Sequence, residues 1–308
     1  MPIRNATLRQ LRAFDAAARH LSFARAAEEL HLSLPAVSMQ LAQLEASAGQ
    51  PLFERVHRKL ALTAAGALVL DHARSVLRQV DDAQASLDAL QGLKRGRVQI
   101  AVTSTAKYFA PRLLARFRER YPDVELALSV ANRELVVDAL AGNEVDLAIM
   151  GRPPERLGAV AEVFARHPLV VIAPRGHPLA RRRRLAPAAL AAYPFIVRER
   201  GSGTRSAMEE FFAAAGVSVP VAMEMASNES IKQAVMANMG LSFLSRHTIA
   251  LELAARRLVL LQVRGLPVVR HWHVAHLAGK RLSPPAEAFR RFVLDEGRRI
   301  VARHAGPA

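Results

Sequence analysis

Residues 8–55 read LRQLRAFDAAARHLSFARAAEELHLSLPAVSMQLAQLEASAGQPLFER and combine three short helical patterns with two tight breaks. In these patterns apolar residues recur every three or four positions, which indicates helices with one buried face. Ser22 and Ser33 are good N-caps for the second and third helices. Pro35 falls in the first turn of the third helix, where a missing N–H costs nothing. The stretch therefore predicts a helix-turn-helix.

The third predicted helix has one apolar face and one small, polar face. Val37, Leu41 and Leu44 recur at spacings of four and three residues and form its buried stripe. Small and polar residues opposite this stripe allow a helix to enter the major groove of DNA, where Ser and Gln hydrogen-bond to base edges. The candidate DNA-contacting residues are Ser33, Leu34, Pro35, Ala36, Ser38, Met39, Gln40 and Gln43.

A hairpin is predicted directly after the three helices. Residues 52–55 and 60–62 resemble short strands around a turn at 56–59. The hairpin offers three cations to DNA phosphates: Arg55, Arg58 and Lys59. A small helical bundle without a role in DNA binding is the alternative at this point, because helix-turn-helix geometry is not confined to DNA-binding proteins.

Residues 64–92 form one long helical stretch, with Thr63 as its predicted cap. At ~1.5 Å per residue this helix is about 43 Å long. Its apolar residues form a narrow seam suited to pairing with a second helix, which implies a dimer and a two-fold related DNA site; an ordinary core helix is the alternative. The seam consists of Ala73, Val76, Val80, Ala83, Leu87 and Leu90.

Nine apolar runs after residue 97 predict strands, and helical patterns lie between most of them. Strands that alternate with crossover helices form mostly parallel sheets, and about 200 residues accommodate two of them. The predicted strands are 98–103, 124–130, 146–150, 169–173, 195–198, 221–225, 241–244, 258–263 and 272–277.

Hydroxyl and basic side chains follow four of these strands, where a helix begins. Helix N-termini present unpaired N–H groups and a partial positive charge, both of which favour anions. Because ligands of α/β sheets bind at the carboxyl ends of the strands, these junctions predict an anion site between two lobes. Ordinary helix caps and solvated side chains are the alternative. The candidate residues are Ser104, Thr105, Lys107, Asn132, Arg133, Arg152, Gly201, Ser202, Gly203, Thr204 and Arg205.

The composition limits the class of protein. The 308 residues contain no cysteine, which excludes disulfides, thiolate zinc sites and cysteine nucleophiles. Without a secretory signal or an apolar segment of membrane-spanning length, we expect a cytoplasmic protein that has no membrane partner. The net charge of +16 favours a nucleic-acid partner. Most of that charge lies beyond residue 97, so charge alone does not locate the DNA-binding element.

No motif indicates catalysis. Neither a Ser/His/Asp order nor paired carboxylates is present, and an alternating α/β pattern alone does not imply an active site. His271, His273 and His276 lie close in sequence, but no carboxylate or cysteine accompanies them, so we interpret them as strand surface. We therefore predict a protein that is not an enzyme and that has no metal site and no cofactor.

The N-terminal motifs AAEELHLS, PAVS, PLFER and LTAAG occur in an order that closely resembles the DNA-binding domain of LysR-type transcriptional regulators. The resemblance implies a winged helix-turn-helix whose groove-facing helix begins at residues 33–38. Members of this family commonly have glutamine or another polar residue where this chain has Leu34. Leucine can contact a thymine methyl group but cannot hydrogen-bond to a base.

Residues 97–305 look like the two-lobed effector domain of the same family, which is similar in fold to periplasmic binding proteins. STAKYFAPRLLARFRERYP at 104–122, NRE at 132–134 and NEVDLAIMGRPP at 143–154 closely resemble the regulators of RuBisCO (Calvin-cycle) operons. Those regulators respond to phosphorylated metabolites. The resemblance implies a small anionic effector such as a sugar phosphate, promoter DNA as a partner, a dimer or tetramer, and RNA polymerase as a further candidate partner.

The expected fold is therefore α/β with three parts. These are a winged helix-turn-helix over residues 6–63, a linker helix over 64–92 and an effector domain over 97–305. The two α/β lobes of the effector domain are expected over about 97–167 with 272–305, and over 168–271. Three alternatives are a LysR-type regulator of sulfur, nitrogen or aromatic-acid genes, a solute-binding module that does not bind DNA, and a metabolic enzyme.

Overall fold

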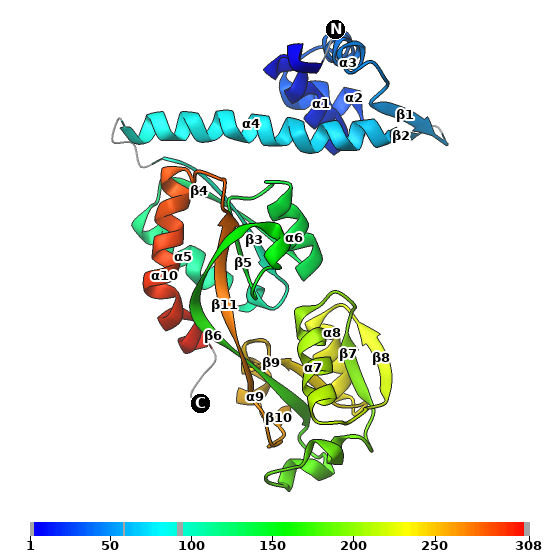
Figure 1. Cartoon of the computed structure of the whole chain (residues 1–308), viewed down its shortest axis with the longest axis vertical. Helices are drawn as coiled ribbons and strands as arrows, with labels where there is room; N and C mark the ends of the chain where they lie inside the picture. Colours follow the sequence, from blue (N-terminus) through cyan, green and yellow to red (C-terminus); the bar gives the residue numbers. More distant parts are fainter. Residues whose placement is uncertain (1–2, 58, 91–94, 305–308) are drawn as a thin grey trace. The chain divides into compact units, whose positions relative to one another are not determined.

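The computed structural model describes residues 3–57, 59–90 and 95–304, which form two compact units (Figure 1). The N-terminal unit ends with a long helix, and the C-terminal unit begins with the strand after it. Arg58, residues 91 and 92 of the expected linker, and residue 305 lie outside the described residues. Among the residues that are described, no helix combines the length and apolar character that a membrane span requires.

The N-terminal unit is a helical bundle with a two-stranded wing. Ser22 and Ser33 accept hydrogen bonds from the backbone N–H groups of Arg25 and Ala36, which confirms both predicted caps. The elements are η1 (Ile3–Asn5), α1 (Leu8–His20), α2 (Phe23–Leu30), α3 (Leu34–Ala48), β1 (Phe53–Val56), β2 (Lys59–Leu62) and α4 (Ala64–Leu90).

Aromatic packing attaches the wing to the helices. Phe53 in β1 makes edge-to-face contacts with Phe14 and Phe23, with ring centroids 5.4 Å and 5.3 Å apart. Glu45 in α3 accepts hydrogen bonds from the backbone N–H groups of Leu52 and Phe53 at 2.7 Å and 3.1 Å. The wing is therefore fixed to the end of the candidate DNA-reading helix.

The long helix α4 begins where the sequence predicts. The hydroxyl of Thr63 accepts a hydrogen bond from the N–H of Gly66 at 2.9 Å. A Cβ on Gly66 would lie 2.0 Å from the carbonyl oxygen of Leu52, so only glycine fits this contact with the wing. Ala73 packs into the bundle core, whereas Val76 and Leu87 further along the seam are exposed.

The C-terminal unit contains a seven-stranded mixed sheet and a separate pair of strands, β7 and β8. The strands are β3 (Gly96–Thr103), β4 (Val124–Ala131), β5 (Leu147–Met150), β6 (Ala159–Pro174), β7 (Phe195–Arg198), β8 (Val221–Met225), β9 (Ser242–Ser245), β10 (Leu258–Leu260) and β11 (Val268–Leu277). The α-helices are α5 (Ala110–Arg120), α6 (Arg133–Ala141), α7 (Gly203–Ala214), α8 (Asn228–Met236), α9 (Ala250–Ala254) and α10 (Pro284–His304). Short 3-10 helices are η2 (Ala106–Tyr108), η3 (Glu155–Leu157), η4 (Pro178–Arg181), η5 (Pro187–Leu190) and η6 (Arg246–Thr248).

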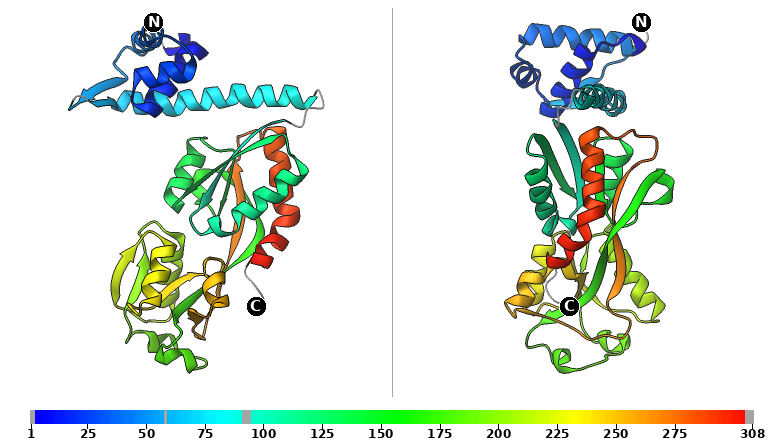
Figure 2. Two further views of the ribbon diagram at one scale, coloured as in Figure 1. Left: turned by 180° about the vertical axis from the view of Figure 1, so that it is seen from behind. Right: turned by 90° about the vertical axis from the view of Figure 1, so that its left-hand side faces the viewer.

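The prediction of two separate, mostly parallel sheets is wrong. β3 pairs in parallel with β4 and β5, but β11 is antiparallel to both β5 and β6, and β6 is also antiparallel to β9 and β10. β6 and β11 lie side by side and run from one lobe into the other (Figures 1 and 2). One continuous sheet therefore joins the lobes, because these strands are long enough to serve both.

Each lobe has its own apolar core. In the first lobe, α5 and α10 pack on the sheet through Phe117, Phe289 and Phe292, and α6 packs through Val136 and Leu140 in a separate cluster (Figure 2). The second lobe is built from β7 to β10 with α7, α8 and α9, and its core lies in two further clusters. The carboxyl ends of β3 and β7 both reach the space between the two lobes.

Candidate functional site

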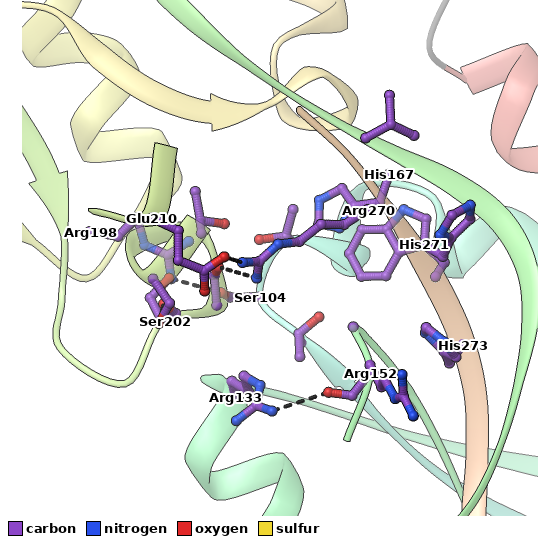
Figure 3. Close-up of a pocket in the computed structure, with 18 of the residues that line it drawn as sticks. Ser104, Arg133, Arg152, His167, Arg198, Ser202, Glu210, Arg270, His271 and His273 are labelled. Atoms are coloured by element: carbon purple, nitrogen blue, oxygen red, sulfur yellow. Dashed lines mark hydrogen bonds and ion pairs between the residues drawn. The ribbon is translucent and has the colours of Figure 1, made fainter. Parts of the chain in front are cut away.

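A cavity of about 700 Å³ lies between the two lobes of the C-terminal unit (Figure 3). Its walls come from the ends of β3, β5 and β7, from the N-termini of α6 and α7, and from the middle of β6 and β11. This volume is in the usual range for small-molecule sites in proteins.

Seven of the eleven candidate anion-binding residues line this cavity. They are Ser104, Thr105, Arg133, Arg152, Ser202, Gly203 and Thr204. They come from four separate junctions, and the structure brings them together around one space, as the topology rule predicts.

The other four candidates do not line the cavity. The ammonium of Lys107 lies 5.3 Å from the ring centre of Tyr108. Asn132 accepts a hydrogen bond from the N–H of Leu135 and caps α6. Gly201 has a φ of +79° and packs against the carboxylate of Glu134.

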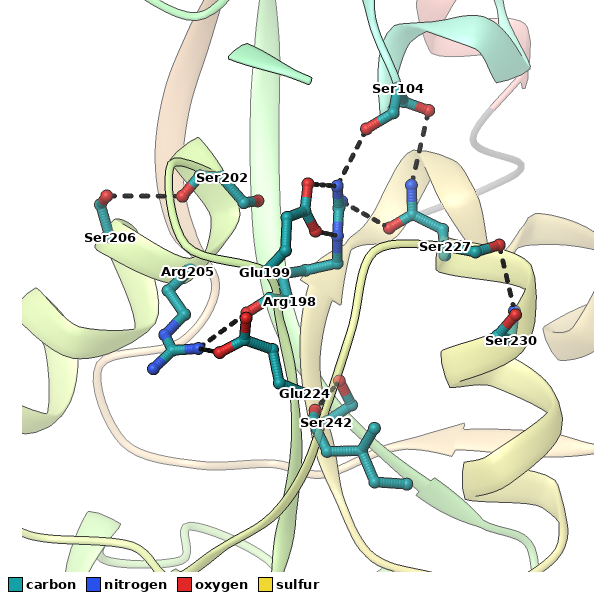
Figure 4. Close-up of polar contacts among 12 residues, drawn as sticks. Ser104, Arg198, Glu199, Ser202, Arg205, Ser206, Glu224, Ser227, Ser230 and Ser242 are labelled. Atoms are coloured by element: carbon teal, nitrogen blue, oxygen red, sulfur yellow. Dashed lines mark hydrogen bonds and ion pairs between the residues drawn. The ribbon is translucent and has the colours of Figure 1, made fainter. Parts of the chain in front are cut away.

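Arg205 is the fourth, and it forms ion pairs and a hydrogen bond within the second lobe. Its guanidinium pairs with Glu209 at 2.7 Å. It also pairs with Glu224 at 2.6 Å and donates a hydrogen bond to the carbonyl of Arg198 at 3.0 Å (Figure 4). These bonds attach α7 to β7 and β8.

Sequence reasoning missed the cavity residues that lie within strands. Arg198 is the last residue of β7. Arg270 and Trp272 lie in β11, on either side of His271 in the sequence. Hydroxyl, glycine and basic residues indicated candidates only in the loops after strands, and the interpretation of His273 as strand surface is wrong, because this residue is buried and lines the cavity. An arginine at the end of the apolar run FIVR was an available signal, because arginine is rarely buried unless it is paired.

Arg198 connects the two lobes at the cavity. Its guanidinium donates to the hydroxyl of Ser104 in the first lobe at 3.0 Å and to the side chain of Asn228 in the second lobe at 2.9 Å. It also forms two hydrogen bonds with the carboxylate of Glu199, at 2.7 Å and 2.8 Å (Figure 4). Arg198 therefore holds the cavity wall together and has little capacity left for a ligand.

Arg133 is differently placed. Within the described ranges, no carboxylate forms an ion pair with it, and it donates one hydrogen bond to the carbonyl of Arg152 at 3.1 Å. Partial burial, followed by repulsion from Arg270, lowers the pKa of Arg133. The positive charge is thus less stable here than in water, and a bound anion would stabilise it.

The N-terminus of α7 adds to this preference for anions. The Ser202 side chain does not cap the helix, and no described residue accepts a hydrogen bond from the N–H of Gly203 or Thr204. Such N–H groups, together with the helix dipole, bind phosphate and carboxylate groups.

Two histidines of the cavity, His167 and His273, contribute little charge at neutral pH. Burial is the main reason that the pKa of His167 lies well below 6.5, and burial also lowers the pKa of His273. The arginines and the helix N-terminus therefore set the electrostatic character of the cavity.

The candidate nucleic-acid interface lies on α3 and the wing. Val37, Leu41 and Leu44 are buried, which confirms the predicted stripe. Of the candidate residues on this helix, Ser33, Leu34, Pro35, Met39 and Gln43 are exposed, and Ala36, Ser38 and Gln40 are half-buried. The side chain of Gln43 accepts a hydrogen bond from Gln10 at 3.1 Å, which orients it. Arg55 and Lys59 are exposed on the wing.

Family models match both units of the chain. The bacterial regulatory helix-turn-helix protein model of the lysR family matches residues 8–67, and the LysR substrate binding domain model matches residues 91–298. The RuBisCO operon transcriptional regulator of Allochromatium vinosum is 51% identical over 297 residues, which cover 96% of this chain and 98% of the relative.

Solved structures agree with these matches. The regulatory domain of Synechocystis CcmR, in complex with 2-PG, is 44% identical with a TM-score of 0.63, over 65% of this chain and 96% of that one. Full-length CbnR, complexed with its target DNA, is 25% identical with a TM-score of 0.68, over 97% of this chain and 99% of that one. With a helix-turn-helix whose third helix leaves one face accessible and a two-lobed domain around an anion-suited cavity, the chain belongs to the LysR family of DNA-binding transcriptional regulators.

Proposed function

We propose that this regulator controls carbon-fixation genes and senses a small phosphorylated metabolite in the cavity between its lobes. The observation that carries the proposal is the anion-suited cavity, in which Arg133 has no carboxylate partner among the described residues and lies beside the open N-terminus of α7. The relatives named for RuBisCO operons and the 2-PG (2-phosphoglycolate) complex of CcmR support this choice of genes and ligand.

For the DNA contact, α3 enters the major groove and the wing contacts the backbone. Ser38 and Gln43 are the groups that would hydrogen-bond to base edges, and Leu34 would contact a thymine methyl group. Arg55, Arg58 and Lys59 would contact phosphates.

The exposed seam of α4 supports a pairing helix. Val76 and Leu87 lie in water in the single chain, and a second copy of the helix would cover them. The resulting dimer, or pair of dimers, would bind a two-fold related site, with RNA polymerase as a further partner. Effector binding would alter DNA binding only if the effector prefers one arrangement of the assembly.

Two titrations of the full-length protein test this proposal. By fluorescence anisotropy at about 0.15 M salt, a promoter fragment of a RuBisCO operon should bind at least about a thousandfold more tightly than random duplex of the same length. By calorimetry, 2-phosphoglycolate should bind and inorganic sulfate should bind more weakly. Equal affinity for both duplexes would contradict the proposed DNA contact, and no heat with 2-phosphoglycolate would contradict the proposed ligand.

A further inference from the structure

Besides Arg152, which lies 3.6 Å from Glu155 with both side chains mostly exposed, two of the cavity arginines hold a carboxylate of the protein at a shorter distance. Arg198 pairs with Glu199, and both side chains are largely buried, at 2% and 16% exposed. Arg270 pairs with Glu210 at 2.6 Å, but these side chains are 35% and 70% exposed. The first pair belongs to the wall of the cavity. The second is an accessible ion pair, and both of its members line the cavity (Figure 3).

Arg270 and Arg133 contact the same residue, Gly203, at the start of α7. Arg270 donates a hydrogen bond to the carbonyl of Gly203 at 3.2 Å. A Cβ built on Gly203 would lie 3.3 Å from Cδ of Arg133. The guanidinium of Arg270 has a carboxylate partner, whereas that of Arg133 has none in the part of the chain that the structure describes. The cavity therefore contains two neighbouring anion positions, and Glu210 occupies one of them.

We propose that Glu210 is a built-in counter-ion, and that the effector carries two anionic groups, one of which replaces it. A phosphate of the effector binds Arg133 and the N-terminus of α7. A second acidic group, such as a carboxylate or another phosphate, displaces the Glu210 carboxylate from Arg270. This inference rests on the proposed function, since it concerns the same cavity and the same class of ligand.

The exposure of the Arg270–Glu210 pair suits such a displacement. An ion pair this accessible to water contributes at most about a fivefold factor to an equilibrium constant. An acidic group delivered by a ligand that is already anchored at Arg133 competes at high effective concentration. A ligand with a single anionic group leaves Glu210 in place. Glu210 therefore competes with ligands that carry two anionic groups and has little effect on single anions such as inorganic phosphate.

The test compares two ligands on Glu210→Gln. The amide keeps the size of the side chain but removes the charge that competes for Arg270. In calorimetry of the full-length protein at about 0.15 M salt, 2-phosphoglycolate should bind Glu210→Gln about three- to fivefold more tightly than wild type. The affinity for inorganic phosphate should change by less than about twofold, because salt screens the remaining long-range effect.

Glu209→Gln is the matched control. Glu209 is the preceding residue of α7 and pairs with Arg205 outside the cavity lining, so this variant should bind both ligands as wild type does. Arg270→Gln removes the second anion position itself and should reduce the preference for 2-phosphoglycolate over phosphate at least about fivefold.

An unchanged or weaker affinity of Glu210→Gln for 2-phosphoglycolate would overturn the inference, and so would an equal gain for inorganic phosphate. Both results would leave the proposed function intact, because wild type would still bind 2-phosphoglycolate. Wild type that bound neither ligand would instead overturn the proposed function, and with it this inference.

Discussion

The guanidinium of Arg198 is almost completely buried, and its hydrogen bonds reach Ser104, Asn228 and Glu199. Removing one member of a buried ion pair leaves the other charge without compensation. We therefore predict that Arg198→Met lowers the free energy of unfolding by about 3 kcal/mol, measured by urea denaturation. Arg116→Met, which breaks an exposed pair with Glu119, should cost less than about 1 kcal/mol. Equal losses in the two variants would contradict the structural role of Arg198.

His167 makes stability depend on pH. Its ring stacks on Trp272 with centroids 3.9 Å apart, and burial holds its pKa well below 6.5. In the unfolded chain the imidazole takes up a proton as the pH falls through 6.5, but in the folded protein it stays neutral. The free energy of unfolding should therefore decrease as the pH falls from about 7.5 to about 5.5.

His167→Gln should remove the share of this decrease that one group supplies, at most about 1.4 kcal/mol per pH unit. Urea denaturation of both proteins at several pH values measures it. Glu29 and Glu287 affect stability in a different pH range. Arginine partners lower the pKa of each to about 2, so the stability that these carboxylates contribute is lost only as the pH falls below the ordinary value of 4.5. Parallel pH curves for variant and wild type would show that His167 titrates normally.

Arg133 and Lys107 should differ in their effect on the effector. Sequence reasoning placed both in the anion site, but only Arg133 lines the cavity. Arg133→Gln should weaken 2-phosphoglycolate binding at least about tenfold, since it removes a charge-assisted contact. Lys107→Ala should bind like wild type in the same calorimetric titration. A large loss in Lys107→Ala would mean that the ligand lies outside this cavity.

Helix α3 is the element that we expect to read the bases of DNA. Ser38→Glu places a carboxylate on the face proposed to enter the major groove and should abolish the preference for promoter DNA over random duplex, measured by anisotropy. Ala46→Glu adds the same charge about two turns further along α3 and should retain most of that preference. If both variants bound alike, α3 would not be the reading helix in the orientation proposed.

The helices of the N-terminal unit could be predicted because their signals are local. Caps at Ser22, Ser33 and Thr63 and apolar spacing within a few residues determine where each helix begins and which face it buries. The strand β6 shows the opposite case. Its prediction began at residue 169, after Pro168, yet Pro168 lies inside the strand opposite Val269. That pairing joins residues about a hundred positions apart, which no local pattern reveals.

The same distinction between local signals and long-range pairing applies to the candidate site. Loops after strands have recognisable hydroxyl, glycine and arginine residues, and the structure places seven of those candidates around the cavity. Arg270 lies in the middle of β11, and only the antiparallel pairing of β11 with β6 brings it to the lobe boundary. Glu210 lies about two turns after the start of α7 and lines the cavity, where it pairs with Arg270. Such residues become visible only when the whole fold is known.

We propose that effector binding in the cavity and DNA binding by the N-terminal unit shift one shared equilibrium of the protein. Thermodynamic linkage requires that DNA alter the affinity for the effector by the same factor as the effector alters the affinity for DNA. The most direct measurement is the calorimetric dissociation constant of 2-phosphoglycolate for the free protein and for the protein saturated with a RuBisCO promoter fragment. We predict that the two constants differ by at least about fivefold. Identical constants would contradict the account.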